Sequence, residues 1–211
     1  MTDVADLSAP TAGKREQTKQ QNRRAILDAA RQVFGELGYE VATVRDIIRR
    51  TNLSVGAFYN YYRSKEEVYE ALSDDGARRF RPILRAQHEA ATDFPSYLRG
   101  AITAYFNFIV DEDESWRDKP LASDYRHPHV RAETPEMKAV FDQVRWSVSD
   151  VLERGAGPKV DSEYLAAACI AIAREVGDKM MDRRPVDVPA AVEFAVQIIL
   201  GGLPALPRLK S

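Results

Sequence analysis

Three helix-start signals lie close together in residues 43–67, and they constrain the chain more than any other feature. Thr43, Ser54 and Ser64 are hydroxyl residues, and each can accept a hydrogen bond from a free backbone N–H group at a helix start. Thr43 and Ser64 are each followed three positions later by an acidic residue, which is the spacing of a capping box. The stretch therefore predicts two short helices, a tight turn and the start of a third helix, the layout of a helix-turn-helix DNA-binding motif.

The apolar residues of this stretch are spaced so that each short helix has one buried side. Asn52 tolerates the left-handed backbone of the turn, which is a common role of asparagine. The small residues Gly56 and Ala57 at the start of the second helix would let that helix approach the floor of a DNA groove. The residues predicted to face inward are Val44, Ile47, Ile48, Leu53, Phe58 and Tyr62.

The run from Leu53 to Glu67 resembles the signature of the tetracycline-repressor (TetR) family of transcriptional regulators. The preceding amphipathic helix, which ends near Leu37, is similar as well, and the resemblance covers about residues 23–72. It implies an all-α fold with an N-terminal three-helix DNA-binding head and a C-terminal helical body that binds a ligand and dimerises. Tyr61 and Tyr62 depart from the family pattern, which often has histidine followed by phenylalanine, and this changes one expected contact with the DNA backbone.

The resemblance also implies which side chains contact DNA. Thr43, Tyr59, Tyr61 and Lys65 would contact phosphates, and Val55, Ala57 and Asn60 would lie near base edges. The amide of Asn60 can pair with N6 and N7 of adenine, whereas the two apolar residues can only contact thymine methyl groups. The alternative is a three-helix module that packs against protein. The full predicted DNA-binding set is Thr43, Ser54, Val55, Gly56, Ala57, Tyr59, Asn60, Tyr61 and Lys65.

The distribution of charge supports the DNA interpretation independently. Residues 1–65 contain 11 Lys or Arg and 7 Asp or Glu, a net charge of +4, whereas the rest contains 19 and 25, a net charge of −6. The total of −2 therefore conceals a basic first part and an acidic body. Residues 14–24 are especially basic and suit a phosphate backbone, although a solvated tail has the same composition. We predict a disordered or partly ordered N-terminal arm at 1–20, within which a solvated tail is preferred for residues 1–13.

Helical patterns continue after the motif, and no repeat or convincing strand is visible. We therefore predict a DNA-binding domain at 21–68, a helical ligand-binding and dimerisation domain at 69–206, and a tail at 207–211. Pro82 should bend or end the first body helix, because proline removes a helix hydrogen bond. The acidic stretch 111–120 is predicted to be an exposed loop. The helices expected in the body span about 64–88, 94–110, 135–154, 161–181 and 189–200.

The last two predicted helices are apolar around most of their circumference, which is unusual for a surface helix. Burial against a second copy of the chain accounts for this pattern, and the family resemblance implies dimerisation through the final two helices. Two-fold pairing also suits a palindromic operator. The alternative is burial within one subunit. The residues predicted to form the dimer interface are Leu165, Ala168, Cys169, Ile172, Val176, Val192, Val196 and Ile199.

Aromatic residues in the middle helices together predict an apolar pocket, although a single aromatic residue at helical spacing is more often part of a plain core. An arginine in the pocket could pair with an anionic head group, which favours a fatty acid, an acyl-CoA or an aromatic acid. Glu175 stands beside one of the candidate arginines. The residues predicted to line the pocket are Tyr105, Phe106, Ile109, Tyr125, Phe141, Arg145, Trp146 and Arg174.

Other classes of site are weakly supported. Asp124, His127 and His129 could contribute metal ligands from a loop, but the chain has no HExxH motif and no cysteine pair, so no metal or cofactor is predicted. The single cysteine, Cys169, excludes an internal disulfide, and no long uninterrupted apolar run suggests a membrane helix. There is no nucleophile elbow, Walker loop or dinucleotide fingerprint, so an enzyme would need an unmarked site.

These patterns together predict a cytoplasmic homodimeric transcriptional regulator that is not an enzyme. The favoured form is a repressor that leaves a palindromic operator when a small apolar or amphipathic molecule binds the body. Two alternatives remain: a ligand-independent DNA-binding regulator or activator, which would have the head but no discrete cavity, and a helical enzyme or carrier, which would not depend on Asn60.

Overall fold

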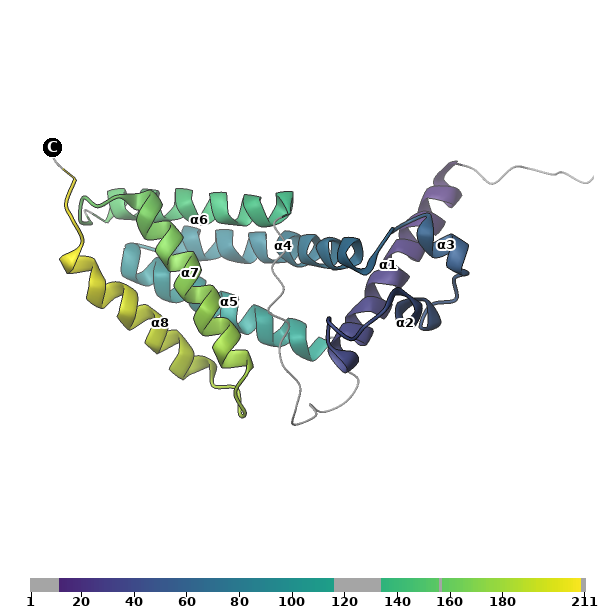
Figure 1. Ribbon diagram of the computed structural model, residues 1–211. Helices are drawn as coiled ribbons and strands as arrows, with labels where there is room; N and C mark the ends of the chain where they lie inside the picture. Colours follow the sequence, from purple (N-terminus) through teal and green to yellow (C-terminus); the bar gives the residue numbers. More distant parts are fainter. Residues whose placement is uncertain (1–11, 116–133, 156, 210–211) are drawn as a thin grey trace, which may run out of the picture.

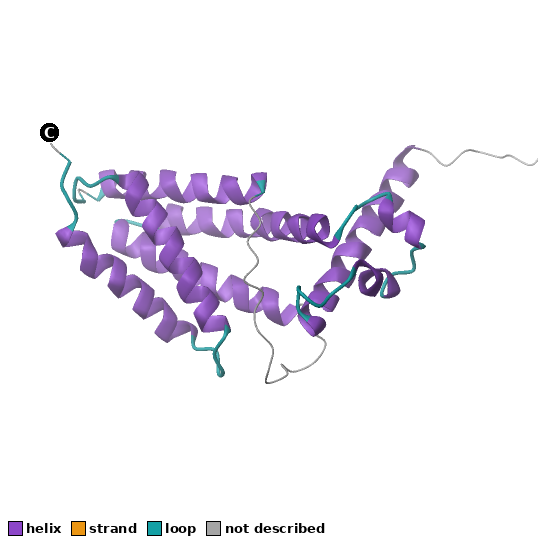
Figure 2. Cartoon of the chain, viewed as in Figure 1, coloured by secondary structure: helices purple, strands orange, loops and turns teal. Residues whose placement is uncertain are grey.

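The computed structural model describes residues 12–115, 134–155 and 157–209, and within these ranges the chain consists of helices and connecting loops (Figures 1 and 2). The predicted all-α fold is confirmed. The head contains α1 (Ala12–Leu37), α2 (Val44–Arg49) and α3 (Val55–Tyr59). The body contains α4 (Lys65–Ala90), α5 (Phe94–Ser115), α6 (Pro135–Arg154), α7 (Ser162–Met181), α8 (Val188–Gly202) and the short 3-10 helix η1 (Leu203–Ala205).

Helix α4 connects the two parts of the molecule. Figure 1 shows the head on the right, the body on the left, and α4 running from one into the other. Its first turns, with Val68 and Leu72, belong to the head core, whereas Phe80 and Leu84 belong to the body core. The predicted boundary at residue 68 therefore falls inside a continuous helix, so a movement of α4 in the body must also affect the head.

The head core is built from the apolar faces that the sequence predicts. Ile47 and Phe58 are fully buried and Tyr62 is 2% exposed, while the apolar stripe of α1 covers them. Burial of this apolar surface is the main favourable contribution to folding of a module of this size. The remaining buried members of this cluster are Ile26, Ala29, Ala30, Val33, Phe34, Ala42, Val68 and Leu72.

The body core forms where α4, α5, α6 and α7 pack together, and α8 packs on α5 and α7. Gly177 lies at a close approach of α7 and α5, because a Cβ atom there would lie 3.1 Å from Ile109 Cδ1 and 3.2 Å from Phe106 Cε1. A larger residue at this position would push the two helices apart.

Three predicted boundaries differ from the observed ones. Helix α1 begins at Ala12, so residues 12–20 extend a helix whose later turns are held by the head core. Helix α4 continues through Pro82, which is exposed. Helix α5 extends to Ser115, so residues 111–115 of the predicted acidic loop are helical, and the rest of that stretch lies outside the described residues.

The segment Val188–Ala205 has the length and mean hydropathy of a membrane-spanning helix. One such helix is weak evidence for a membrane span, because core helices and interface helices can have the same composition. Val192, Ala195, Val196 and Ile199 in this segment are buried against the rest of the subunit. The hydropathy of α8 is therefore partly accounted for by packing within the subunit.

Candidate nucleic-acid interface and body cavity

Side-chain caps fix the starts of α2 and α3, and these confirm the predicted signals. The Thr43 hydroxyl accepts a hydrogen bond from the backbone N–H of Asp46 at 3.3 Å, and the Asp46 carboxylate accepts one from the Thr43 N–H at 3.0 Å. The Thr43 hydroxyl also donates to this carboxylate, which lowers the pKa of Asp46 below its ordinary value. Ser54 Oγ accepts from Ala57 N at 3.2 Å. Local hydrogen bonds thus define where each of the two short helices begins.

The start of α4 is capped in a slightly different way from the prediction. Ser64 Oγ accepts from Glu67 N at 3.3 Å, as expected for an N-cap. The carboxylate of Glu67 reaches back to the backbone N–H of Arg63, at 2.6 Å, which is one residue before the cap. The turn between α3 and α4 is therefore held from both sides.

The outer face of α3 is exposed, as a DNA-reading helix requires. The exposed fraction is 58% for Val55 and 51% for Tyr59, and Asn60 is exposed at the C-terminal cap. Ala57 is half-buried. Arg45 and Arg49 of α2 are also exposed, which adds positive charge beside this face. The predicted base-reading and phosphate-binding residues of α3 thus lie on an accessible surface.

The two consecutive tyrosines after α3 both contact α1. The hydroxyl of Tyr61 accepts a hydrogen bond from Asn22 Nδ2 at 3.1 Å, and that of Tyr62 accepts one from Arg23 Nε at 3.1 Å. The Arg23 guanidinium also lies 5.6 Å from the centre of the Tyr62 ring. Tyr61 therefore helps to hold α3 against α1, and its predicted phosphate contact would use the same hydroxyl.

The ammonium group of Lys65 makes contacts within the chain that differ from the predicted contact with a phosphate. Its ammonium group donates to the carbonyl oxygens of Tyr39, Glu40 and Ala42 at 2.8, 3.2 and 3.2 Å and lies 4.6 Å from the centre of the Tyr39 ring. An ammonium group has three N–H donors, so all three are used within the chain. Lys65 therefore ties the loop between α1 and α2 to α4 and is not presented as a free phosphate ligand.

Gly56 offers a test of the DNA interface that leaves the fold intact. A Cβ atom at Gly56 would meet no other atom of the chain within 4 Å. Packing within the subunit therefore does not require glycine, whereas close approach to a groove would. We expect Gly56→Val to unfold within about 2 °C of the unsubstituted protein, because surface substitutions change stability by about 0.5 kcal/mol or less.

Operator affinity of the Gly56→Val variant should nevertheless fall by roughly tenfold or more, which corresponds to about 1.4 kcal/mol of binding free energy. Thermal unfolding by circular dichroism and fluorescence anisotropy with operator DNA measure the two quantities. Ala86→Val, at an exposed position of α4, is the matched control and should change neither. Equal operator affinity for Gly56→Val and Ala86→Val would contradict an approach of α3 to DNA.

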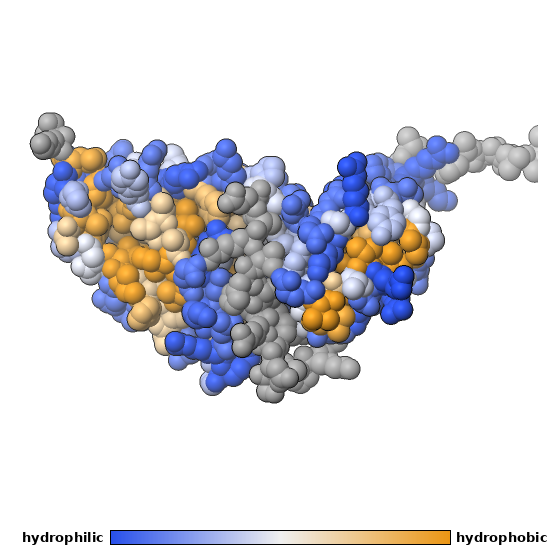
Figure 3. All heavy atoms as spheres, in the orientation of Figure 1, coloured by the Kyte–Doolittle hydropathy of each residue, from blue (hydrophilic) through white to orange (hydrophobic). Residues whose placement is uncertain are grey.

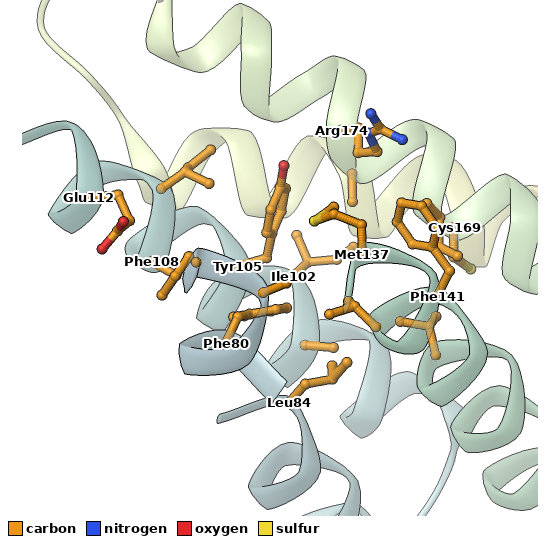
Figure 4. A pocket seen from close by; sticks show the side chains of 18 of the residues that line it. Phe80, Leu84, Ile102, Tyr105, Phe108, Glu112, Met137, Phe141, Cys169 and Arg174 are labelled. Carbon is orange, nitrogen blue, oxygen red and sulfur yellow. The ribbon is translucent and has the colours of Figure 1, made fainter. Parts of the chain in front are cut away.

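The body contains an apolar cavity of about 290 Å³ between α4, α5, α6 and α7. This volume is near the lower end of the range of about 300–1,000 Å³ for small-molecule sites. Figure 4 shows Phe80 and Leu84 of α4 on one side and Arg174 of α7 on the other, with Tyr105, Met137 and Phe141 between them. The wall nearest the head includes Tyr69, Leu72 and Ser73 of α4. The cavity thus reaches the helix shared by head and body.

Four of the predicted pocket residues line this cavity: Tyr105, Ile109, Phe141 and Arg174. The Arg174 guanidinium lies 5.5 Å from the centre of the Phe141 ring. The other described candidates do not line it. Phe106 is fully buried in the core, Arg145 is exposed and pairs with Asp142, and Trp146 is 58% exposed with its ring 4.4 Å from that of His88. Glu175 is exposed, and Tyr125 lies outside the described residues.

The sequence prediction missed the wall formed by α4. Leu72, Gly76, Phe80 and Leu84 are spaced by four residues and lie along one face of that helix. This spacing was visible in the sequence, but it is equally suited to an ordinary core. Only the packing of α5 and α6 shows that part of this face borders a cavity.

Two weakly acidic groups of the cavity wall are held in their neutral forms. Burial raises the pKa of Tyr97 to about 12 and that of Cys169 to about 12. Both groups therefore stay protonated at neutral pH, and the Cys169 thiol is a poor nucleophile there. The Tyr97 ring is 2% exposed and also lines the cavity. These two residues therefore add no charge to the cavity wall.

The face of α7 and α8 that remains exposed differs from the predicted interface. Five residues predicted to form the dimer interface are instead buried within the subunit, so their prediction as interface residues was wrong. They are Leu165, Cys169, Val192, Val196 and Ile199. Ile172 and Val176 are half-buried against the same core. Of the predicted set, Ala168 is exposed.

Another set of residues forms the outer apolar face of α7 and α8. Tyr164 is 79% exposed, Phe194 58% and Ile198 47%, and Ala167, Ala168 and Ala171 are exposed as well. Figure 3 shows hydrophobic residues gathered over these helices in the left half of the view. We call these six residues the α7–α8 outer face. Its composition is suited to contact with another protein surface.

The candidate metal ligands Asp124, His127 and His129 lie outside the described residues. Within the described part of the chain, no group of three or more His, Cys, Asp or Glu side chains is placed to hold a metal ion.

Comparison with known proteins agrees with the helix-turn-helix motif that the structure shows in the head. The model of bacterial regulatory proteins of the tetR family matches residues 26–72. The chain is 28% identical to the HTH-type transcriptional activator FasR of Mycolicibacterium smegmatis, in an alignment of 223 positions that covers 100% of both chains.

Solved structures share the fold over most of the chain. The fatty acid degradation regulator FadR from Bacillus halodurans has a TM-score of 0.68 and 23% identity, over 86% of this chain and 95% of that one. The transcriptional regulator FadR from Bacillus subtilis in complex with stearoyl-CoA has a TM-score of 0.65 and 16% identity, over 85% and 98%. At these identities the likeness shows the fold. The helix-turn-helix head, the match to residues 26–72 and the relative aligned over the whole chain together show that residues 26–72 form a DNA-binding domain of the tetR family of bacterial regulatory proteins.

Proposed function

We propose that this DNA-binding transcriptional regulator acts in the cytoplasm as a homodimer and leaves a palindromic operator when an apolar or amphipathic molecule occupies the body cavity. One observation carries the proposal. The wall of the cavity includes Tyr69 and Leu72 of α4, and both residues also pack in the head core beneath the DNA-reading helices. A ligand that reshapes this wall therefore acts on the helix that follows α3 directly.

The proposed reading surface is the exposed face of α3. Asn60 pairs with a base edge, Val55 and Ala57 contact bases through apolar groups, and Tyr59, Tyr61 and Thr43 contact phosphates. Ser54 and Gly56 allow the N-terminal turn of α3 to enter the groove. The exposure of Val55, Tyr59 and Asn60 supports this arrangement. The basic residues 14–24 of α1 add contacts to the phosphate backbone.

The proposed ligand has a long apolar part. Rings and aliphatic side chains dominate the cavity wall, and Arg174 is a cationic group available for an anionic or polar head group. The stearoyl-CoA complex of a protein with the same fold supports a fatty acyl compound as the first ligand to test.

The proposed dimer pairs the α7–α8 outer faces of two subunits. Phe194 and Ile198 project from α8, and exposed alanines on α7 permit close approach of helices. An exposed apolar face of this kind in a soluble protein is usually covered by a partner surface. A two-fold pair would present two copies of α3 to operator half-sites, about 34–36 Å apart if they occupy successive turns of the groove.

Activation is the second candidate for the sign of regulation. The full-length relative from Mycolicibacterium smegmatis is named an activator, which favours this alternative. A promoter-reporter assay in cells with and without the chain separates the two signs. Higher reporter activity without the chain means repression, and lower activity means activation.

The function is tested by the binding of the purified protein to its own upstream DNA at several salt concentrations, against scrambled DNA of equal length. We expect selective binding of two subunits to each operator, one subunit on each half-site. Operator binding should become weaker after addition of stearoyl-CoA. Free coenzyme A controls for the head group. Equal affinity for both DNAs would refute specific reading of this site. Unchanged operator affinity at saturating stearoyl-CoA would refute that effector.

Asn60→Ala tests the proposed base contact directly. Loss of one good base pairing should weaken specific binding by roughly 5- to 150-fold, or about 1–3 kcal/mol, and leave binding to scrambled DNA nearly unchanged. Asn107→Ala, at an exposed position of α5 in the body, is the matched control. Anisotropy titrations with both DNAs measure the difference. A uniform loss on both DNAs would mean that Asn60 contacts the backbone and not a base.

A further inference from the structure

A series of charged hydrogen bonds joins the wall of the cavity to the first helix of the head. Glu112 of α5 lines the cavity and accepts from both terminal nitrogens of Arg79 on α4, with 2.6 Å between Nη2 and Oε2. Arg79 Nε donates to Asp75 Oδ2 at 3.2 Å. The same oxygen of Asp75 accepts from Arg31 Nη2 of α1 at 2.5 Å. We call these four residues the α1–α5 ion-pair series.

The two end members of this series are shielded from solvent. The side chain of Arg31 is 17% exposed and that of Glu112 is 18% exposed. Isolated surface ion pairs contribute little, because water screens them and the side chains lose conformational freedom. A bidentate contact within a partly buried series is stronger and more directional. Arg31 is also held by Asp28 on its own helix, at 2.7 Å, so its guanidinium is fixed relative to α1.

Arg79 contacts the cavity wall in a second way. Its guanidinium lies 5.7 Å from the centre of the Phe108 ring, and Phe108 lines the cavity one turn before Glu112. The Phe108 ring is in turn 5.2 Å from that of Phe80, another wall residue. Figure 4 shows Phe108 and Glu112 together on α5 at one end of the cavity. A molecule that displaces either side chain changes the position of Arg79.

We propose that Glu112 is the positioning residue through which occupancy of the cavity changes the orientation of the DNA-reading head. The inference rests on the proposed ligand control of operator binding. Displacement of Glu112 or Phe108 removes a contact of Arg79, and the Asp75 carboxylate then holds Arg31 less firmly. Since α1 packs on both α2 and α4, a change at Arg31 alters the angle between α4 and the head. The ligand thereby favours one of two arrangements of the head.

The test uses a double-substitution cycle on the full-length protein. Glu112→Gln keeps the size of the side chain and removes its charge, and Arg31→Met removes the charge at the head end. Operator affinity is measured for both variants and their combination, without ligand and with saturating stearoyl-CoA. Arg31 does not line the cavity, so Arg31→Met should leave the affinity for stearoyl-CoA unchanged. Thermal unfolding establishes that each variant is folded.

Glu136→Gln provides the matched control. Glu136 of α6 pairs with Arg81 at 3.4 Å and with Arg78 at 3.8 Å, both on α4. These pairs connect two body helices. The control variant should respond to stearoyl-CoA as the unsubstituted protein does.

We expect each single substitution to reduce the ligand-induced change in operator affinity by roughly 3- to 10-fold. The double substitution should cause no further loss, because both residues act through one series. Additive losses, or an equal loss in Glu136→Gln, would overturn the proposal.

The cycle also separates this inference from the proposed effector. If stearoyl-CoA leaves the operator affinity of the unsubstituted protein unchanged, the proposed effector fails. The operator affinities measured without ligand can still be compared across the two single variants and the double variant. If the ion-pair series exists, the effects of Glu112→Gln and Arg31→Met on this affinity are not additive. Additive effects, or no effect of either single substitution, would overturn the ion-pair series itself.

Discussion

Replacing Phe194 and Ile198 together by glutamate is expected to convert the protein to a monomer and to lower operator affinity by roughly 100-fold or more. Both side chains project from α8 into solvent in the single subunit, so the subunit's own core is left intact. In a dimer of this variant, the interface would bury four carboxylates, two from each subunit, that have no partners. Burial of an unpaired charge costs several kcal/mol. A monomer would contact only one operator half-site and lose the gain from simultaneous binding.

Sedimentation velocity and anisotropy with operator DNA measure the two effects of this double substitution. Ile83→Glu is the matched control, because Ile83 is an exposed isoleucine of α4, with 39% of its surface accessible, that lies outside the α7–α8 outer face. The control should remain dimeric and bind the operator normally. Retention of the dimer by Phe194→Glu with Ile198→Glu would show that another surface pairs the subunits.

Phe58→Ala is expected to unfold or loosen the head while the body remains folded. Phe58 is fully buried at the centre of the head cluster, beside Tyr62. Truncation of a buried phenylalanine costs about 3–5 kcal/mol. The free energy of unfolding of a head of this size is small, since that of a whole domain is only about 5–15 kcal/mol. Operator binding should therefore be lost.

Hydrogen exchange locates the effect of Phe58→Ala. Amide protection should fall throughout α1, α2 and α3 and persist in α5, α6 and α7. Tyr59→Ala is the control, because Tyr59 is the next residue and is 51% exposed. It should keep amide protection in the head and lose only operator affinity. Equal loss of protection in α6 and α7 would mean that the two clusters unfold as a single cooperative unit through α4.

Local signals in the sequence were sufficient to predict most helix starts. The predicted caps at Thr43, Ser54 and Ser64 are all present, and each accepts a hydrogen bond from the backbone N–H three residues later. Such bonds depend on the chain immediately around them, so a sequence pattern specifies them well. The inward faces of the short head helices were predictable for the same reason, because each has only one apolar side.

The orientation of helices α7 and α8 could not be predicted from such local signals. Apolar residues surround most of their circumference, so periodicity does not determine which side meets the subunit's own core. The structure buries Leu165 and Val196 and leaves Phe194 exposed, the reverse of the predicted orientation. The choice follows from how α8 packs against α5 and α7, which is a property of the assembled body.

The sequence by itself therefore determined the all-α class, the helix-turn-helix head and the main helix starts. Tertiary structure decided the three carbonyl partners of Lys65, the contribution of α4 to the cavity and the pairing of Arg31 with Asp75. Arg31 and Asp75 are 44 positions apart in the chain. Local patterns specify hydrogen bonds and faces within a helix, whereas contacts between distant segments depend on how complete helices pack against one another.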